Sequence, residues 1–278
     1  MPVNHVYLNL GGGKLYQFSN KSHVQMMSYL IESPDGRLIM IDGGNCCDED
    51  ADFLEGVLRE KGGHVSAWFL THAHDDHYGT LLRLLEREKL KLTIDGIYFS
   101  FPSPDWPAIA RENQQQHFAA FWELLPKSGI PTVRIGRGDC FDFGVSIKVL
   151  NSLPDYENMP SVNDTSIVLR VGFPKRDVLF LADLAPEGQK ILVNESRNKL
   201  RCDIVQMAHH GQNGVTFDMY SLIEPKICLY PTPDWLWEND NGGGRDSGPW
   251  RTLQTREWME QLHVQASFPA AFGDYVFE

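Results

Sequence analysis

The chain has 278 residues, of which 42% are hydrophobic and 22% are charged, and its formal net charge is −12. This composition is typical of a globular protein with a buried core and excludes an intrinsically disordered chain. Because an acidic protein repels phosphate backbones, we expect no extended binding to nucleic acid. A small anionic substrate held at a metal site remains compatible with this charge.

The sequence contains no apolar stretch of the roughly 20 residues that a membrane-spanning helix needs. Its first residues lack the basic and apolar segments of a signal peptide. Five cysteines without a C-x-x-C pair fit a reducing compartment, and we interpret the adjacent Cys46 and Cys47 as loop thiols. We therefore expect a cytoplasmic protein without a membrane partner, and the sequence leaves its oligomeric state open.

The first half of the chain alternates strand patterns with helix patterns. Apolar residues on both sides of Pro34-Asp35-Gly36 predict a β-hairpin whose second strand ends at Asp42. Hydrophobic periodicity then predicts helices over 48–61, 78–89 and 107–125, and strands over 65–70 and 94–100.

The second half repeats this alternation. Strands are predicted over 145–151, 165–173, 177–183, 202–208 and 226–231, and helices over 186–197, 214–223 and 249–262. A stretch rich in Gly, Pro and Trp at 231–250 predicts a long loop, and loops of this length are usually functional or disordered. Without a linker or an internal repeat, the pattern predicts one layered α/β domain over residues 1–278.

The densest group of metal-binding side chains is the sequence THAHDDHY at 71–78, directly after the predicted strand 65–70. Its residues His72, His74, Asp76 and His77 form an H-x-H-x-D-H pattern. Imidazole and carboxylate groups both bind zinc-like ions, and α/β sheets place ligand sites at the carboxyl ends of strands. With 10 histidines in the chain, chance would produce this pattern in only about one such sequence in a thousand. The pattern therefore predicts a metal site.

Other residues of the same chemistry also follow predicted strands. Asp42, Asp183, His209 and His210 each lie at or just after the carboxyl end of a strand. Taken alone, Asp42 or Asp183 is better interpreted as an ordinary turn or helix-cap residue. Because several strand ends carry ligand-type residues, we predict that they converge on one shared site.

These motifs, in this order and spacing, resemble those of the metallo-β-lactamase fold hydrolases. The similarity covers the D-G-G at Asp42, the T-H-x-H-x-D-H-x-G at 71–79, the A-D at Asp183 and the H-H-G at 209–211. The second half resembles the branch that contains the hydrolase domain of competence DNA-uptake proteins and the bacterial phosphorylcholine esterases. The resemblance implies an αββα sandwich, in which two mixed sheets are flanked by helices and two divalent ions, zinc first and manganese or iron as alternatives, lie at the sheet edge.

The resemblance also implies roles for individual residues. It gives His72 and His74 to the first ion, Asp76, His77 and one histidine of the pair to the second ion, and Asp183 to both. Asp42 would orient the ligands. We take His210 as the ligand and His209 as the group that donates a proton or hydrogen bond to substrate, although the sequence leaves the reverse assignment open.

This chain departs from the family pattern in two places. The family's usual further histidine is missing: His117 lies in a predicted helix, and Asn163-Asp164 stands at the expected strand start. The first ion would then keep open positions, and Asn163 becomes a candidate for substrate binding. Secondly, the loop 231–250 contains Trp235, Trp237 and Arg245, which could form a substrate-selecting lid. Alternatively, the two tryptophans simply anchor the loop to the core.

We therefore expect a dinuclear metal-dependent hydrolase that cleaves a small phosphodiester through a hydroxide bridging the two ions. Asp42, Asp76 and His209 are its candidate catalytic residues. One alternative keeps the site but changes the bond to a lactone, a thioester or a β-lactam. Another is a non-catalytic metal-binding protein or a redox protein on the same scaffold.

Overall fold

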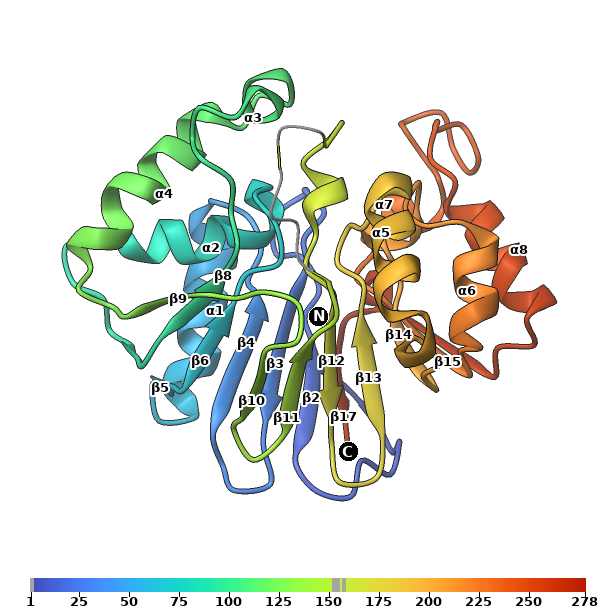
Figure 1. Ribbon diagram of the computed structural model, residues 1–278, viewed down its shortest axis with the longest axis horizontal. Helices are drawn as coiled ribbons and strands as arrows, with labels where there is room; N and C mark the ends of the chain where they lie inside the picture. The colour runs from blue at the N-terminus through green and yellow to red at the C-terminus, as the bar shows by residue number, and fades with distance from the viewer. Residues whose placement is uncertain (1–2, 152–155, 157–158) are drawn as a thin grey trace.

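A computed structural model describes residues 3–151, 156 and 159–278 of the chain. Two β-sheets lie face to face, and helices cover the outer face of each sheet (Figure 1). The expected αββα sandwich with two mixed sheets is therefore confirmed. In the same described ranges, no helix combines the length and the apolar character that crossing a bilayer requires.

The first sheet contains eight strands in the part of the chain that the structure describes. Their spatial order is β1 (Val3–Val6), β17 (Asp274–Phe277), β2 (Lys14–Gln17), β3 (Ser28–Glu32), β4 (Leu38–Asp42), β6 (Ala67–Phe69), β8 (Ile97–Phe99) and β9 (Thr132–Arg134). Strands β3 and β4 form the predicted antiparallel hairpin, whereas β4, β6, β8 and β9 run parallel. Gly36 in the hairpin turn has a φ of 86°, a conformation that glycine adopts without steric cost.

The second sheet has seven strands within the described ranges. Their order is β10 (Cys140–Asp142), β11 (Ser146–Val149), β12 (Leu169–Gly172), β13 (Asp177–Phe180), β14 (Ile204–Gln206), β15 (Ile227–Tyr230) and β16 (Ala266–Pro269). Strands β10 to β13 are antiparallel, and β13 to β16 are parallel. A small separate pair joins β5 (His64–Val65) to β7 (Thr93–Ile94).

The helices fall into two outer layers that follow the order of the chain. The first sheet is covered by α1 (Asp48–Glu60), α2 (Asp75–Leu85), α3 (Pro107–Arg111) and α4 (Gln115–Lys127), and the second by α5 (Pro186–Ser196), α6 (Phe217–Ile223), α7 (Asp234–Trp237) and α8 (Thr252–Gln261). In Figure 1 these layers lie at the left and right of the sheets, and the arrowheads of β4 and β13 point to the same edge.

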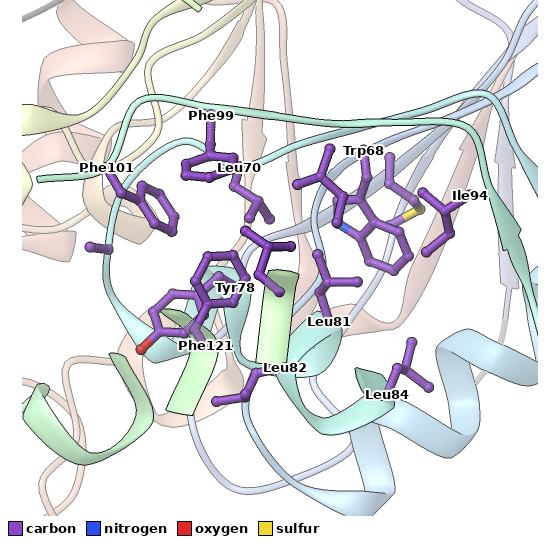
Figure 2. Packing of buried hydrophobic residues seen from close by; sticks show 14 of the residues in the cluster. Trp68, Leu70, Tyr78, Leu81, Leu82, Leu84, Ile94, Phe99, Phe101 and Phe121 are labelled. Atoms are coloured by element: carbon purple, nitrogen blue, oxygen red, sulfur yellow. The ribbon is translucent and has the colours of Figure 1, made fainter. Parts of the chain in front are cut away.

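Both faces of the central strands are buried, which explains their continuous apolar sequences. In β6, Trp68 points to the helix layer, where it packs in the same core cluster as Tyr78, Leu81 and Phe121 (Figure 2). Phe69 points the opposite way, into the core between the two sheets. Full burial of a side chain of this size stabilises the fold by about 1.5–3 kcal/mol.

Two predicted helices differ from the observed ones near the expected site. The helix predicted over 78–89 begins at Asp75, because the backbone of His74 is extended and the acidic residues after it stabilise a helix N-terminus. The helix predicted over 107–125 is interrupted, because Asn113 has the left-handed φ of 58° and separates α3 from α4. The loop 231–250 also contains the short helix α7.

Candidate metal centre

The carboxyl ends of strands from both sheets deliver the candidate ligands to one edge of the sandwich. Asp42 is the last residue of β4, and Asp183 follows β13. The H-x-H-x-D-H motif follows β6 and continues into the first turn of α2, while the histidine pair lies in the 3-10 helix His209–Gly211 after β14. Parallel strands place their carboxyl ends at the same edge, which is why these sequence-distant residues converge.

Two groups of side chains have the geometry to hold a metal ion. The first group is His72, His74 and Asp183, and the second is Asp76, His77, Asp183 and His210. Within each group, one nitrogen or oxygen atom from every residue lies within 4.8 Å of the others. Asp183 belongs to both groups and is the residue through which they meet.

Asp183 lies close to three histidines of the two groups. One carboxylate oxygen, Oδ1, lies 3.2 Å from Nε2 of His77, and the other, Oδ2, lies 3.5 Å from Nε2 of His210. Oδ2 also lies 3.9 Å from Nε2 of His72. All four side chains are buried, with exposed fractions of 0–1%.

Several buried polar atoms at this point have no hydrogen-bond partner among the described residues. They are both carboxylate oxygens of Asp183 and the Nε2 atoms of His77 and His210. Leaving a buried polar group unpaired costs about 1–3 kcal/mol, and more for a charged group. Imidazole nitrogens and carboxylate oxygens are the donors that zinc-like divalent ions take. The residues therefore fit two divalent ions.

Hydrogen bonds at Nδ1 of His77 and of His210 determine that Nε2 is the nitrogen of each ring that can bind a metal ion. Nδ1 of His77 donates to Oδ2 of Asp42 at 2.7 Å, and Nδ1 of His210 donates to the carbonyl of Pro231 at 2.8 Å. With these protons on Nδ1, each ring turns Nε2 toward Asp183 as a potential ligand.

Asp42 lies behind the ligands and belongs to neither group. Its buried carboxylate also accepts hydrogen bonds from the backbone N–H and the hydroxyl of Thr71, at 2.8 and 2.7 Å. It thereby ties the end of β4 to the start of the histidine motif. Its left-handed φ of 54° turns the chain sharply into the two glycines that follow.

The first group contacts a residue that the sequence did not suggest. Nδ1 of His74 lies 3.1 Å from Nε2 of His72, and Nε2 of His74 lies 2.6 Å from Oε2 of Glu112. Glu112 follows α3, in the middle of a predicted continuous helix, so no sequence pattern singles it out. His117 pairs with Asp75 at 3.0 Å and belongs to neither ligand group.

His209 and Asn163 lie beside Asp183 but outside both ligand groups. Nδ1 of His209 donates to the carbonyl of Asn213 at 3.0 Å, and its Nε2 accepts from Nδ2 of Asn163 at 3.3 Å. The same Nε2 lies 3.8 Å from Oδ2 of Asp183. The side-chain oxygen of Asn163 is buried, with no hydrogen-bond partner in the described ranges. The structure thus places His210 in the second group and His209 at its margin.

A second residue that sequence reasoning missed supports Asp76. The side-chain amide of Gln25 donates to Oδ2 of Asp76 at 3.1 Å, and Gln212 donates to the side-chain oxygen of Gln25 at 3.2 Å. Gln25 precedes β3, far from the motif in sequence, and only the fold brings it to the site.

The electrostatics of the centre favour positive charge. Burial lowers the pKa of His210, but the carboxylates of Asp183 and Asp76 outweigh burial and raise that pKa to about 10. Burial likewise lowers the pKa of His77, and the carboxylates around it raise it well above its ordinary value. Burial lowers the pKa of His72, with a further contribution from His77. Bound cations would balance the negative charge of these carboxylates, which protonated histidines otherwise balance.

Three residues of the loop 231–250 were predicted to bind substrate, and they differ in how deeply they are buried. Trp237 is 8% exposed and packs in the core, with its ring centroid 5.2 Å from that of Tyr230 and 3.9 Å from the guanidinium carbon of Arg256. This packing fits the alternative that Trp237 anchors the loop to the core, and its substrate-binding role stays a prediction. Packing against Tyr230 and Arg256 removes most of the apolar surface of the indole from water.

Trp235 and Arg245 lie closer to the surface. The indole N–H of Trp235 donates to the carbonyl of His23 at 3.1 Å, and its ring lies 4.9 Å from that of Trp250. Because His23 is two residues from Gln25, Trp235 adjoins the segment that supports Asp76. Arg245 is 63% exposed and pairs with Glu238 at 3.4 Å, and no described contact links it to the ligands.

Comparison with known proteins identifies the chain's family. The family model described as "Metallo-beta-lactamase superfamily" matches residues 24–230. A curated relative is the ComE operon protein 3 of Bacillus subtilis (strain 168), which is 26% identical over 176 residues. This match covers 62% of the present chain but only 20% of that protein.

Solved structures share the architecture at low sequence identity. The metallo-beta-lactamase fold protein YhfI from Bacillus subtilis is 16% identical, with a TM-score of 0.58, and the alignment covers 95% of this chain and 99% of that one. CmlA, a diiron beta-hydroxylase from Streptomyces venezuelae, is 12% identical with a TM-score of 0.57, over 92% of this chain and 52% of that one. At these identities the likeness shows the fold alone.

Proposed function

The chain belongs to the metallo-beta-lactamase superfamily, and from this premise we propose that it is a dinuclear metal-dependent phosphodiesterase acting on a small anionic substrate. We further propose zinc as the native ion. The superfamily by itself does not fix the bond that is cleaved, since one fold supports many chemistries. The proposal therefore depends on the arrangement of residues around Asp183.

The observation that carries the proposal is that the two ligand groups differ in their number of protein ligands. The second group has four protein ligands, whereas the first has three, His72, His74 and Asp183. A catalytic zinc site characteristically keeps three protein ligands and an open position. The imidazole of His209 lies 3.8 Å from Asp183, the residue that both groups share, and the amide of Asn163 contacts that imidazole.

The residues around the open position suit an anionic phosphoryl group. Two divalent ions, when bound, would polarise a phosphoryl oxygen and lower the pKa of a water molecule. The amide N–H of Asn163 can donate to a phosphoryl oxygen. Nδ1 of His209 donates to the carbonyl of Asn213, so Nε2 of the neutral ring keeps its lone pair and can take up a proton before donating it to the substrate.

Two further considerations favour a small phosphodiester. The second half of the sequence resembles the branch that includes the phosphorylcholine esterases, and the amide of Asn163 replaces the histidine that is usual in the family. The net charge of −12 disfavours long polyanions. We therefore propose that long duplex DNA is a poor substrate.

The test compares substrates under matched metal content. Purified protein is stripped of metal and reloaded with Zn²⁺, Mn²⁺ or Fe²⁺, and its metal content is measured by elemental analysis. Bis(4-nitrophenyl) phosphate, a lactone and a chromogenic cephalosporin are then compared, with Asp183→Asn as the inactive control. We expect the phosphodiester to be cleaved fastest. Much faster turnover of the lactone or the cephalosporin would overturn the proposal.

A further inference from the structure

We infer that Glu112 is a positioning residue for the first metal site, which sets the affinity of the ion held by His72 and His74. This inference rests on the two-ion centre of the proposed function but is independent of which bond the protein cleaves. The evidence is the contact of Glu112 with His74, the shape of the backbone around Glu112 and the separate support of the second group.

Glu112 binds the nitrogen of His74 that faces away from the first group. Its Oε2 accepts from Nε2 of His74 at 2.6 Å, while Nδ1 of His74 lies 3.1 Å from Nε2 of His72. When Nε2 of His74 carries the proton, the lone pair of the ring is on Nδ1. This nitrogen points toward His72 and would bind the first ion. A carboxylate partner also makes the ring a more basic ligand. The side chains are 15% and 27% exposed, so water screens this contact only partly.

The interruption between α3 and α4 brings Glu112 to this position. Asn113, with a φ of 58°, turns the chain directly after Glu112. The next residue, Gln114, accepts a hydrogen bond from the backbone N–H of Asp75 at 3.1 Å. Two consecutive contacts therefore dock the interruption onto His74 and Asp75, at the start of α2. The break between the two helices thus places Glu112 and Gln114 against the segment that carries the ligand His74.

Glu112 also holds the chain segment that carries Asn163. Its second oxygen, Oε1, accepts from the backbone N–H of Val162 at 2.9 Å. One carboxylate therefore connects a ligand of the first ion to the residue preceding Asn163.

The second group receives its support from other residues. His77 is oriented by Asp42, and His210 is oriented by the carbonyl of Pro231. Neither contact involves Glu112. Loss of Glu112 should therefore weaken the first ion selectively, whereas a general loss of structure would weaken both ions.

The experiment measures each site in the full chain with the other site disabled. Asp76→Asn provides a background in which the first site dominates, and His72→Ala one in which the second dominates. Glu112→Ala and Glu112→Gln are introduced into each background, and Zn²⁺ affinity is measured by competition with a chromophoric chelator. Visible absorption of Co²⁺-loaded protein gives an independent readout of ligand geometry. His117→Ala is the control, because His117 also pairs with a carboxylate near α2 but lies in neither ligand group.

We expect Glu112→Ala to weaken Zn²⁺ binding about 10- to 100-fold in the first-site background, the range typical of lost outer partners of metal ligands. Binding in the second-site background should stay at the level of the parent variant. Glu112→Gln should also weaken the first site, because its single amide oxygen can accept from only one of His74 and Val162 and the side chain carries no charge. The Co²⁺ spectrum should change only where the first site is intact.

Unchanged affinity of the first site in both Glu112 variants, or equal losses at the two sites, would overturn the inference. If Glu112→Ala fails to fold, Glu112→Gln decides, because it keeps the volume of the side chain. An absence of phosphodiester cleavage by the wild-type protein would count against the proposed function only. These metal-binding measurements would still test Glu112.

Discussion

Nδ1 of His77 lies 2.7 Å from Oδ2 of Asp42, and both side chains are fully buried. This contact connects the end of β4 with the first turn of α2. It also makes Nε2 the ring nitrogen that faces Asp183. A residue outside both ligand groups thus determines how a ligand is presented, as is common for histidines that bind metals.

Asp42→Asn should weaken the second ion about 10- to 100-fold. An asparagine amide can donate to Nδ1 of His77, which would move the ring proton to Nε2 and remove the lone pair from the ligand position. The contact with Thr71 would also weaken, so the free energy of unfolding should fall by about 1–3 kcal/mol. Zinc titration and chemical denaturation measure the two effects.

The matched control for Asp42→Asn is Asp95→Asn. Asp95 lies 2.8 Å from Nε2 of His64, and both side chains are more than half exposed, outside the metal centre. This variant should bind zinc like the wild type and lose little stability, because exposed pairs contribute only about 0–1 kcal/mol. Equal zinc affinities in the two variants would contradict the role of Asp42.

Asp183→Asn should remove most of the bound metal from both positions, because Asp183 is the residue that the two ligand groups share. Asp76→Asn should lower the metal content by about one equivalent per chain, since Asp76 belongs to the second group only. Elemental analysis after dialysis against metal-free buffer distinguishes the two variants. Two retained equivalents in Asp183→Asn would show that Asp183 does not bridge.

The sequence allowed the convergence of the ligands to be predicted because the relevant information is local. Apolar runs that end in Asp42 or Asp183, or that precede the H-x-H-x-D-H motif, mark the carboxyl ends of buried strands. Parallel strands bring such ends to one edge of a sheet. The order of the strands was not needed for this step. The family resemblance then gave the αββα arrangement that the structure confirms.

Residues whose positions depend on tertiary contacts could not be predicted. Glu112 reaches His74 only because the chain turns at Asn113, and helical periodicity across 107–125 gives no sign of that turn. Gln25 supports Asp76 from a segment 51 positions away in the sequence. Likewise, the composition of the loop 231–250 does not reveal that Trp237 is buried while Trp235 is partly exposed.

Removal of metal should lower thermal stability, and Tm should rise with the logarithm of the free Zn²⁺ concentration above the Kd. An ion that binds only the folded state stabilises it by about 2.7 kcal/mol when its free concentration is 100 times its Kd. For a chain of this size, that corresponds to a rise of roughly 4–5 °C in Tm. Thermal melts of stripped protein over a series of Zn²⁺ concentrations test this expectation. Asp183→Asn should show little response, and an equal response in that variant would place the stabilising ion elsewhere.

Substitutions of the two tryptophans of α7 should have different effects, one on stability and the other on substrate recognition. Trp237→Ala should lower the free energy of unfolding by about 3–5 kcal/mol, because it removes a buried indole from its contacts with Tyr230 and Arg256. Trp235→Ala should change stability much less, because that ring is partly exposed and packs mainly on Trp250. Trp235 adjoins the segment that supports Asp76, so its loss should lower kcat/KM for the phosphodiester several-fold at unchanged metal content. Chemical denaturation and steady-state kinetics on both variants test this division. A Trp235→Ala protein with native kinetics would leave α7 with a structural role only.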